Sequence, residues 1–156
     1  MNFTSKKLFK NLVYILASIT PRQTCSSLSN TMNKAPQKIS IRSAGFQHVN
    51  GIYQQQPPTL IPAGFEKTCR AMNWNTKQMW IQLSDQSRPW YEAEKNESYV
   101  YWNRGDGKWW IDCPSGTGIF IVKNDGWFPP KSGWIALDSE YEPIPEVTPI
   151  SMDKQQ

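Results

Sequence analysis

Residues 98–113 have the sequence Ser-Tyr-Val-Tyr-Trp-Asn-Arg-Gly-Asp-Gly-Lys-Trp-Trp-Ile-Asp-Cys, in which a glycine-rich connection joins two aromatic and β-branched runs. Such runs favour strands, because aromatic and branched side chains pack well on a pleated sheet. Gly and Asp between them supply the backbone conformations that a tight turn needs. The segment therefore predicts an antiparallel hairpin with strands at Tyr99–Asn103 and Lys108–Cys113.

The same pattern of short strand-like runs, each ended by Gly, Pro, Asn or Asp, continues on both sides of the hairpin. It predicts an all-β domain, a small antiparallel meander that forms a barrel or a sandwich. No comparable 3.6-residue periodicity follows the N-terminal leader, so we expect little helix. The other predicted strands are Ile39–Arg42, Gly51–Gln55, Phe65–Met72, Gln78–Leu83, Trp90–Glu94, Gly118–Lys123 and Trp134–Leu137.

All eight tryptophans of the 156-residue chain lie between Trp74 and Trp134, so this window is expected to hold the hydrophobic core. Neighbouring strand residues point to opposite faces, and Trp109 and Trp110 therefore cannot both enter one core. We expect one of the two to be exposed or covered by a tail. The number of indoles leaves two interpretations open, an aromatic interface or a core that takes all of them.

The charges divide the chain into three parts. Residues 1–65 contain seven Lys or Arg and no acid, whereas residues 66–156 contain ten basic and thirteen acidic residues, a net charge of −3. Residues 1–38 form a basic leader and its linker, and in one interpretation the leader is helical. A Trp-rich β domain follows at 39–138, and an acidic, proline-rich extended tail at 139–156. Because the β domain is not basic, nucleic-acid binding is not expected.

The leader combines cations, many Ser and Thr residues and the short apolar run Leu12–Ala17, which are features of a targeting segment. Its lack of acids favours a transit peptide and an organelle, either plastid or mitochondrion. A basic start before an apolar run also fits a secretory signal, so a secreted protein is the alternative, and a retained basic arm is a third interpretation. The apolar run is far shorter than the roughly 20 residues that a membrane-spanning helix needs.

Two cysteines, Cys69 and Cys113, lie in the predicted domain. An oxidising compartment would allow a disulfide between them and a reducing one would leave buried thiols, and sequence spacing does not distinguish the two. No Cys-x-x-Cys motif or Cys/His cluster is present, and His48 is the only histidine. The sequence therefore predicts no metal site, no cofactor and no histidine-based catalytic triad.

Carboxylates give the only sign of a catalytic centre. Glu92 and Glu94 share one face of a predicted strand, and Asp106 and Asp112 flank the central hairpin. Paired carboxylates can hydrolyse glycosidic bonds when they are held several ångströms apart. A solvated strand face and a polar turn explain the same residues more simply, so we expect a protein that is not an enzyme.

Three motifs resemble a known module. Asn50–Tyr53 (Asn-Gly-Ile-Tyr), Trp109–Ile111 (Trp-Trp-Ile) and Pro129–Trp134 (Pro-Pro-Lys-Ser-Gly-Trp) have the order and spacing of a small Trp-rich β module seen, often repeated, in algal and other protist proteins. The resemblance covers about residues 45–137 and supports the extent of the β domain. The module has no assigned biochemical activity, so the resemblance implies no catalytic or ligand-binding residue.

The sequence favours a non-catalytic binding or assembly module, an accessory subunit of a larger organellar complex that contacts a membrane only peripherally or through that complex. Its expected partners are other protein subunits. The alternative is a carbohydrate-binding, lectin-like domain of a secreted protein, in which exposed aromatic rings stack on sugars. For both functions the expected binding residues are Trp80, Trp90, Tyr91, Trp102, Trp109, Trp110 and Trp127.

Overall fold

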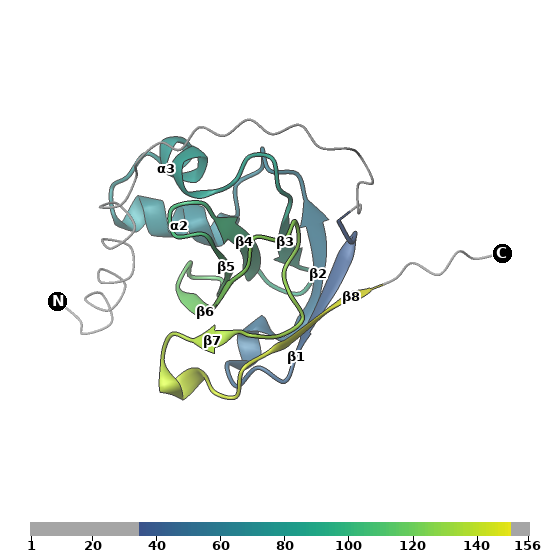
Figure 1. Cartoon of the computed structure of the whole chain (residues 1–156). Coiled ribbons are helices and arrows are strands. Elements are labelled where there is room, and N and C mark those ends of the chain that lie inside the picture. The colour runs from purple at the N-terminus through teal and green to yellow at the C-terminus, as the bar shows by residue number, and fades with distance from the viewer. Residues whose placement is uncertain (1–34, 151–156) are drawn as a thin grey trace, which may run out of the picture.

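The computed structural model describes residues 35–150, and the predictions made for the leader concern residues outside this range. Eight strands account for most of the regular structure (Figure 1). They are β1 (Lys38–Arg42), β2 (Gly51–Gln56), β3 (Trp90–Ala93), β4 (Tyr99–Asn103), β5 (Lys108–Asp112), β6 (Gly118–Lys123), β7 (Ile135–Ala136) and β8 (Glu146–Ile150). The helical elements are α2 (Ala63–Ala71), α3 (Thr76–Leu83) and two 3-10 turns, η1 (Gln47–Val49) and η2 (Ser139–Tyr141).

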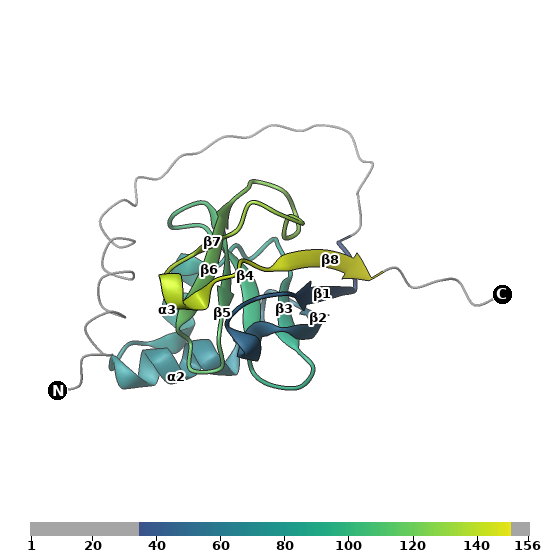
Figure 2. The same ribbon diagram turned by 90° about the horizontal axis from the view of Figure 1, so that it is seen from below.

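The strands form one antiparallel sheet in the order β7-β6-β5-β4-β3-β2-β1-β8. Seven of the strands therefore lie beside their sequence neighbours, as in a meander, and β8 returns to pair with β1. Figure 2 shows the consequence of the twist, because β1 and β8 cross β5 and β6 at a steep angle and the sheet curls into a half-barrel. The prediction of an all-β, antiparallel and curled domain is confirmed.

The hairpin of β4 and β5 forms with the register that the sequence predicts. Asn103 pairs with Lys108 next to the turn. The amide of Gly107 donates to the carbonyl of Asn103 at 2.9 Å, and Gly107 has a φ of +68°. Only glycine adopts that conformation without strain, so the turn depends on this residue. The Asn103 side chain accepts a further hydrogen bond from the Gly105 amide at 2.8 Å.

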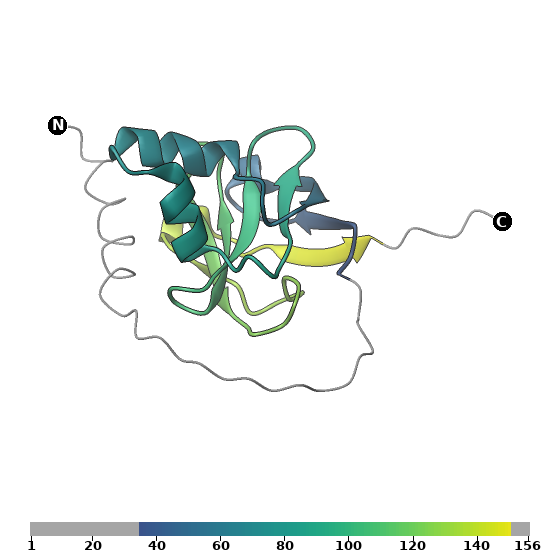
Figure 3. The ribbon, with the colours of Figure 1, turned by 90° about the horizontal axis from the view of Figure 1, so that it is seen from above.

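Each face of the sheet has its own hydrophobic cluster. The inner cluster fills the concave side of the half-barrel and draws on almost every strand. Its larger members are Ile39, Ile41, Val49, Tyr53, Tyr91, Val100, Trp109, Ile111, Ile119, Phe120, Val122, Trp134 and Val147. The helix-face cluster lies between the other side of β3–β5 and the two helices, which Figure 3 shows together on one side of the sheet. It comprises Phe65, Cys69, Trp80, Leu83, Trp90, Tyr99, Tyr101 and Trp110.

The two clusters correct the expectation for Trp109 and Trp110. The side chains do point to opposite faces, Trp109 into the inner cluster and Trp110 into the helix-face cluster. The expectation that one would be exposed or covered by a tail is wrong, because they are 0% and 5% exposed. The helices, which were not predicted, cover the second face. Gly118 opposite makes room for the Trp110 ring, since a Cβ there would lie 2.6 Å from it.

Helix α2, which ends at Ala71, occupies most of the segment Phe65–Met72, which was predicted to be a strand. Phe65, Thr68 and Cys69 are buried, a spacing of three and four residues that marks one face of a helix. The helix ends where Asn73 takes a left-handed conformation with a φ of +56°, as is common just after a helix. The strand prediction was wrong because this segment buries one helical face, although it contains aromatic and β-branched residues.

Helix α3 occupies Gln78–Leu83, the second segment wrongly predicted to be a strand. The Asn75 side chain accepts a hydrogen bond from the Gln78 amide at 3.0 Å and caps the first turn. Trp80 and Leu83, three residues apart, are buried, whereas Ile81 is 47% exposed. A segment as short as Gln78–Leu83 fits the two-residue period of a strand as well as the 3.6-residue period of a helix. The Asn75 cap was the sequence signal that favoured the helix.

The proline-rich segment after Asp138 lies along the domain and ends in strand β8. The amide of Val147 points away from β1 and donates to the carbonyl of Lys131 at 3.1 Å, so this outer edge of the sheet is partly covered. Pro149 lies two residues on, and its nitrogen therefore faces the same outer side. An edge strand tolerates proline there because no ladder hydrogen bond is lost.

Loss of either central indole tests the two-cluster arrangement. Trp109→Ala and Trp110→Ala should each lower the free energy of unfolding by about 3–5 kcal/mol, because each removes a buried ring from a different cluster. Trp127→Ala, at a site 55% exposed, should cost less than about 1 kcal/mol. Urea denaturation followed by circular dichroism measures all three. A loss below about 1 kcal/mol for either central variant would contradict burial on both faces.

Candidate functional site

The seven aromatic side chains expected to form a binding surface divide into a buried group and a surface group. Five are at most 5% exposed and belong to the two clusters: Trp80, Trp90, Tyr91, Trp109 and Trp110. Trp102 is half-buried, and Trp127, 55% exposed, presents most of its ring to solvent. Of the predicted set, the structure therefore leaves Trp127 and part of Trp102 accessible.

Trp102 and Trp127 lie at one end of the half-barrel, which we call the mouth. Three connections meet there: residues 84–89 between α3 and β3, residues 104–107 between β4 and β5, and residues 124–128 after β6. The amide of Arg104 donates to the carbonyl of Leu83 at 2.8 Å and joins the first two connections. The mouth of a curled sheet is a common place for a binding site, because loops from several strands converge on it.

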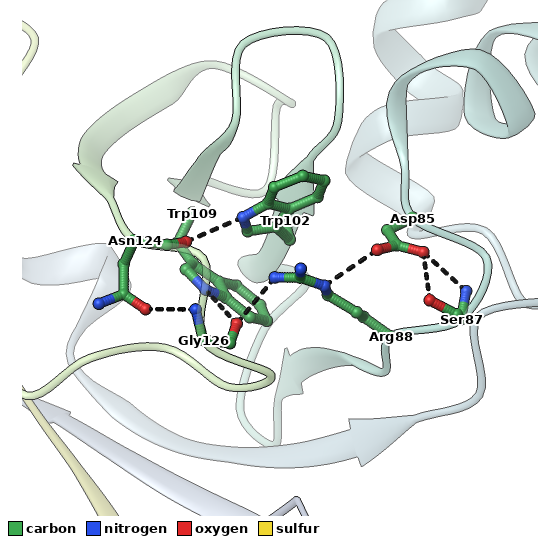
Figure 4. A network of polar contacts seen from close by, with 7 residues as sticks. All are labelled: Asp85, Ser87, Arg88, Trp102, Trp109, Asn124 and Gly126. Atoms are coloured by element: carbon green, nitrogen blue, oxygen red, sulfur yellow. Dashed lines mark hydrogen bonds and ion pairs between the residues drawn. The ribbon is translucent and has the colours of Figure 1, made fainter. Parts of the chain in front are cut away.

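Arg88 occupies the centre of the mouth, beside the Trp102 ring (Figure 4). Its guanidinium carbon lies 4.1 Å from the centre of the Trp102 ring and 5.3 Å from that of Trp127. Asp85 forms an ion pair with Arg88 Nε at 2.9 Å, and Arg88 Nη1 donates to the Gly126 carbonyl at 2.8 Å. The side chain of Arg88 is only 13% exposed. The cation thus holds the two rings together from within.

The loop that carries Trp127 is held by indole N–H groups from the sheet. Trp102 Nε1 donates to the carbonyl of Asn124 at 3.0 Å, and Trp109 Nε1 donates to the carbonyl of Gly126 at 3.3 Å. The Asn124 side chain also accepts from the Gly126 amide at 2.7 Å. Hydrogen bonds therefore fix residues 124–126 (Figure 4), and Trp127 follows directly in the same loop.

The arrangement provides groups for non-covalent contact with a ligand. An exposed indole offers a large apolar face, and a cation against its ring adds attraction of roughly 0.5–1 kcal/mol at an exposed site. The polar groups nearest to it are already engaged, since Asp85 accepts from Ser87 and pairs with Arg88. Trp127 is the large apolar side chain that the mouth presents to solvent.

Sequence reasoning included Trp127 among its candidates but missed Arg88, on which the site depends. Arg88 lies in a loop, Asp85-Gln-Ser-Arg-Pro89, that has no motif. Its distant partners come from positions 102, 126 and 127, and only the meander brings them together. The one usable signal was local, because Asp85 followed three residues later by Arg88 is a common spacing for an ion pair.

The carboxylates considered for catalysis are engaged elsewhere or buried. Glu94 forms an ion pair with Lys38 at 2.6 Å on the solvent side of the sheet. Asp106 accepts hydrogen bonds from Trp110 Nε1 at 3.2 Å. Glu92 is half-buried in β3, and burial raises the pKa of its carboxyl. Asp112 is enclosed beneath α2 and is 4% exposed.

Asp112 has no cation beside it among the described residues. Its Oδ1 atom and the hydroxyl of Tyr99, its partner across the strands, both lack a hydrogen-bond partner within residues 35–150. Burial raises the pKa of Asp112 to about 7, and the Tyr99 hydroxyl beside it lowers that pKa only in part. The carboxyl is thus a buried acid that is protonated in mildly acidic solution.

Cys69 and Cys113, for which a disulfide and buried thiols were both considered, are free thiols in the structure. Cys69 belongs to the helix-face cluster and Cys113 to the inner cluster, so the sheet lies between the two groups. Burial raises the pKa of the Cys69 thiol and disfavours the reactive thiolate. The Cys113 sulfur lies 3.0 Å from the Ser115 hydroxyl oxygen.

Within residues 35–150, no three His, Cys, Asp or Glu side chains gather as metal ligands would. No helix in the same part of the chain has the length and apolarity that a membrane crossing requires. The chain matches no family model, no curated protein and no solved structure. The resemblance to the protist module therefore stays an interpretation of short motifs.

The buried carboxyl predicts an unusual dependence of stability on pH. Because the pKa of Asp112 is higher in the folded than in the unfolded chain, the folded protein binds this proton more tightly. The resulting stabilisation is complete below about pH 4 and is lost as the pH rises to about 7. Between these two values it contributes a slope of roughly −1.4 kcal/mol per pH unit to the free energy of unfolding. Asp112→Asn should remove this slope and stabilise the protein at pH 8.

Urea denaturation between pH 4 and pH 8 measures the effect. Asp125→Asn, which changes an exposed aspartate in the mouth, is the matched control and should keep the wild-type slope. Equal slopes in wild type and Asp112→Asn would show that the carboxyl ionises without cost, and would contradict its burial.

Proposed function

We propose that this protein is a non-catalytic binding module that docks onto a protein partner through the mouth. The observation behind the proposal is Trp127, an indole 55% exposed although it stacks on Arg88. Trp and Arg are enriched among the residues that dominate protein–protein binding energy. Isolated apolar residues at a surface need no explanation. An exposed tryptophan that is held in place by a largely buried cation, in contrast, indicates a binding site.

Pre-organisation strengthens this argument. A side chain that is ordered only on binding loses conformational entropy, roughly 0.5–1.5 kcal/mol for each flexible residue. The Trp127 loop avoids much of that loss, because hydrogen bonds to the carbonyls of Asn124 and Gly126 fix it in the free protein. The mouth is therefore suited to contact a partner with little rearrangement.

The setting that we propose is a larger organellar assembly, in a plastid or a mitochondrion, of which this chain is an accessory subunit. The proposal rests on the basic, acid-free and hydroxyl-rich composition of residues 1–34. The residues of the Trp-rich motifs support a structural role for the domain, because their side chains form hydrogen bonds within it. Tyr53 donates from its hydroxyl to the carbonyl of Val49 at 2.7 Å, and Trp134 Nε1 donates to that of Pro130 at 3.0 Å.

A second candidate function is carbohydrate binding by a secreted protein. The free face of Trp127 favours it, because sugars stack on exposed indoles. Sugar sites also need several polar groups that converge on the ring to bind hydroxyls. In the mouth, Asp85 and the Asn124 side chain already bind within the protein, and Asp125 is the one acid that stays exposed there. The structure therefore favours a protein partner.

Trp127→Ala tests the proposed function in the full chain expressed in its native cells. Wild type should migrate in an assembly larger than the monomer on native gels. The variant should bind at least about 30-fold more weakly, the loss typical of a dominant interface residue, and should move to the monomer position. Its thermal midpoint should stay close to that of wild type.

Ile135→Ala is the matched control, because Ile135 is 62% exposed on β7, outside the mouth. It should assemble as wild type does. A wild-type protein that is monomeric in native extracts, or a Trp127→Ala variant that assembles normally, would count against the proposal. Glycan-array binding by wild type that Trp127→Ala abolishes would support the carbohydrate alternative.

A further inference from the structure

The end of the half-barrel opposite to the mouth contains an open hollow of about 530 Å³. Its walls come from the end of β1, the loop that leads through η1 to β2, the start of β2 and Pro143 from the C-terminal segment. Strand β1 runs away from the mouth, since Lys38 lies beside Gln54 and Arg42 lies at the far end. The hollow is therefore separate from the Trp127 site.

Among the residues that the structure describes, Arg42 is the only cation that lines the hollow, and no acid lines it. Its Nε donates to the Ser40 hydroxyl at 3.1 Å, which orients the guanidinium group. Glu146 is its direct neighbour across the strands, but that carboxylate pairs with Lys131 Nζ at 3.1 Å. Within residues 35–150, Arg42 makes no ion pair, and no hydrogen bond from its two terminal nitrogens is found.

The wall around Arg42 is rigid. The Asn50 side chain accepts from the Ala44 amide at 3.0 Å and donates to the Ala44 carbonyl at 2.9 Å. The Gly45 amide donates to the Pro143 carbonyl at 2.8 Å, and the backbone there leaves no room for a Cβ. Ser43 adopts a left-handed conformation, with a φ of +62°, that non-glycine residues rarely take. Backbone strain of this kind is concentrated at binding sites.

The remaining lining combines apolar residues with uncharged polar ones. Ile52, 41% exposed, and Pro143 present hydrocarbon to the hollow. The Ser43 side chain adds a hydroxyl group to the lining, whereas the Gln47 carboxamide donates to the Ala44 carbonyl at 3.3 Å and accepts from the Asn50 side chain at 3.2 Å. A single oriented guanidinium beside apolar walls is complementary to a ligand that has one anionic group and an apolar body.

We propose that this hollow binds a small monocarboxylate, whose carboxylate accepts two parallel hydrogen bonds from Arg42 and whose apolar body rests on Ile52 and Pro143. A planar carboxylate matches the fork of a guanidinium. A dianionic phosphate fits less well, because one cation lines the site and Glu146 lies on the adjacent strand. The site is independent of the proposed partner-binding mouth.

Titration of the ¹⁵N-labelled full chain with benzoate tests the proposal, with amide chemical shifts as the readout. Benzoate should shift the amides of residues 40–52 saturably and leave those of residues 124–128 unchanged. Benzamide, the neutral analogue, and inorganic phosphate should each bind at least about tenfold more weakly. Arg42→Gln should lose benzoate binding by a similar factor while keeping the wild-type spectrum elsewhere.

Arg70→Gln is the control, since it removes a cation 72% exposed on α2 and should leave binding unchanged. Arg42→Lys keeps the charge but not the fork, and should bind benzoate more weakly than wild type. No saturable shift at residues 40–52, equal binding of benzamide, tighter binding of phosphate, or full binding by Arg42→Gln would each overturn the proposal.

Discussion

Two adjacent tryptophans in a central strand impose the constraint on which the rest of the fold depends. Because strand residues alternate between faces, Trp109 and Trp110 require that both sides of the sheet be covered. The curl of the sheet encloses Trp109, and helices α2 and α3 enclose Trp110. Covering also requires a hydrogen-bond partner for each buried indole N–H. Six of the eight tryptophans donate to loop residues: Trp80 to Pro58, Trp90 to Pro57 and Leu60, Trp102 to Asn124, Trp109 to Gly126, Trp110 to Asp106 and Trp134 to Pro130.

These indole hydrogen bonds link the core to the surface. They place the loop that carries Trp127 over the end of the inner cluster, where Arg88 completes the stack. At the opposite end of the strands no indole is available, and the Asn50 side chain organises the loop instead. The two ends therefore differ in chemistry. The mouth presents an aromatic face suited to a protein surface, and the other end presents one oriented cation beside apolar walls.

The sequence was sufficient to predict those features that depend on residues close together in the chain. The hairpin of β4 and β5, the antiparallel meander and the opposite directions of Trp109 and Trp110 all follow from alternation and turn residues. The strand predictions for Phe65–Met72 and Gln78–Leu83 were wrong because segments this short fit both the period of a strand and that of a helix. Packing against Trp110 decides in favour of the helix. Burial of the candidate tryptophans depends on those helices, so the site could not be narrowed to Trp127 in advance. Arg88 and Arg42 owe their roles to partners distant in sequence, which single-sequence patterns do not show.

The fold depends on two separate aromatic clusters, one on each side of β5. The most direct test is a nuclear Overhauser spectrum of the full chain that assigns the neighbours of both central indoles. The ring protons of Trp110 should contact Gly118 and the helix-face cluster, and those of Trp109 should contact the inner cluster. Contacts from both rings to the same cluster, or an indole N–H of either residue in rapid exchange with solvent, would contradict a sheet covered on both faces.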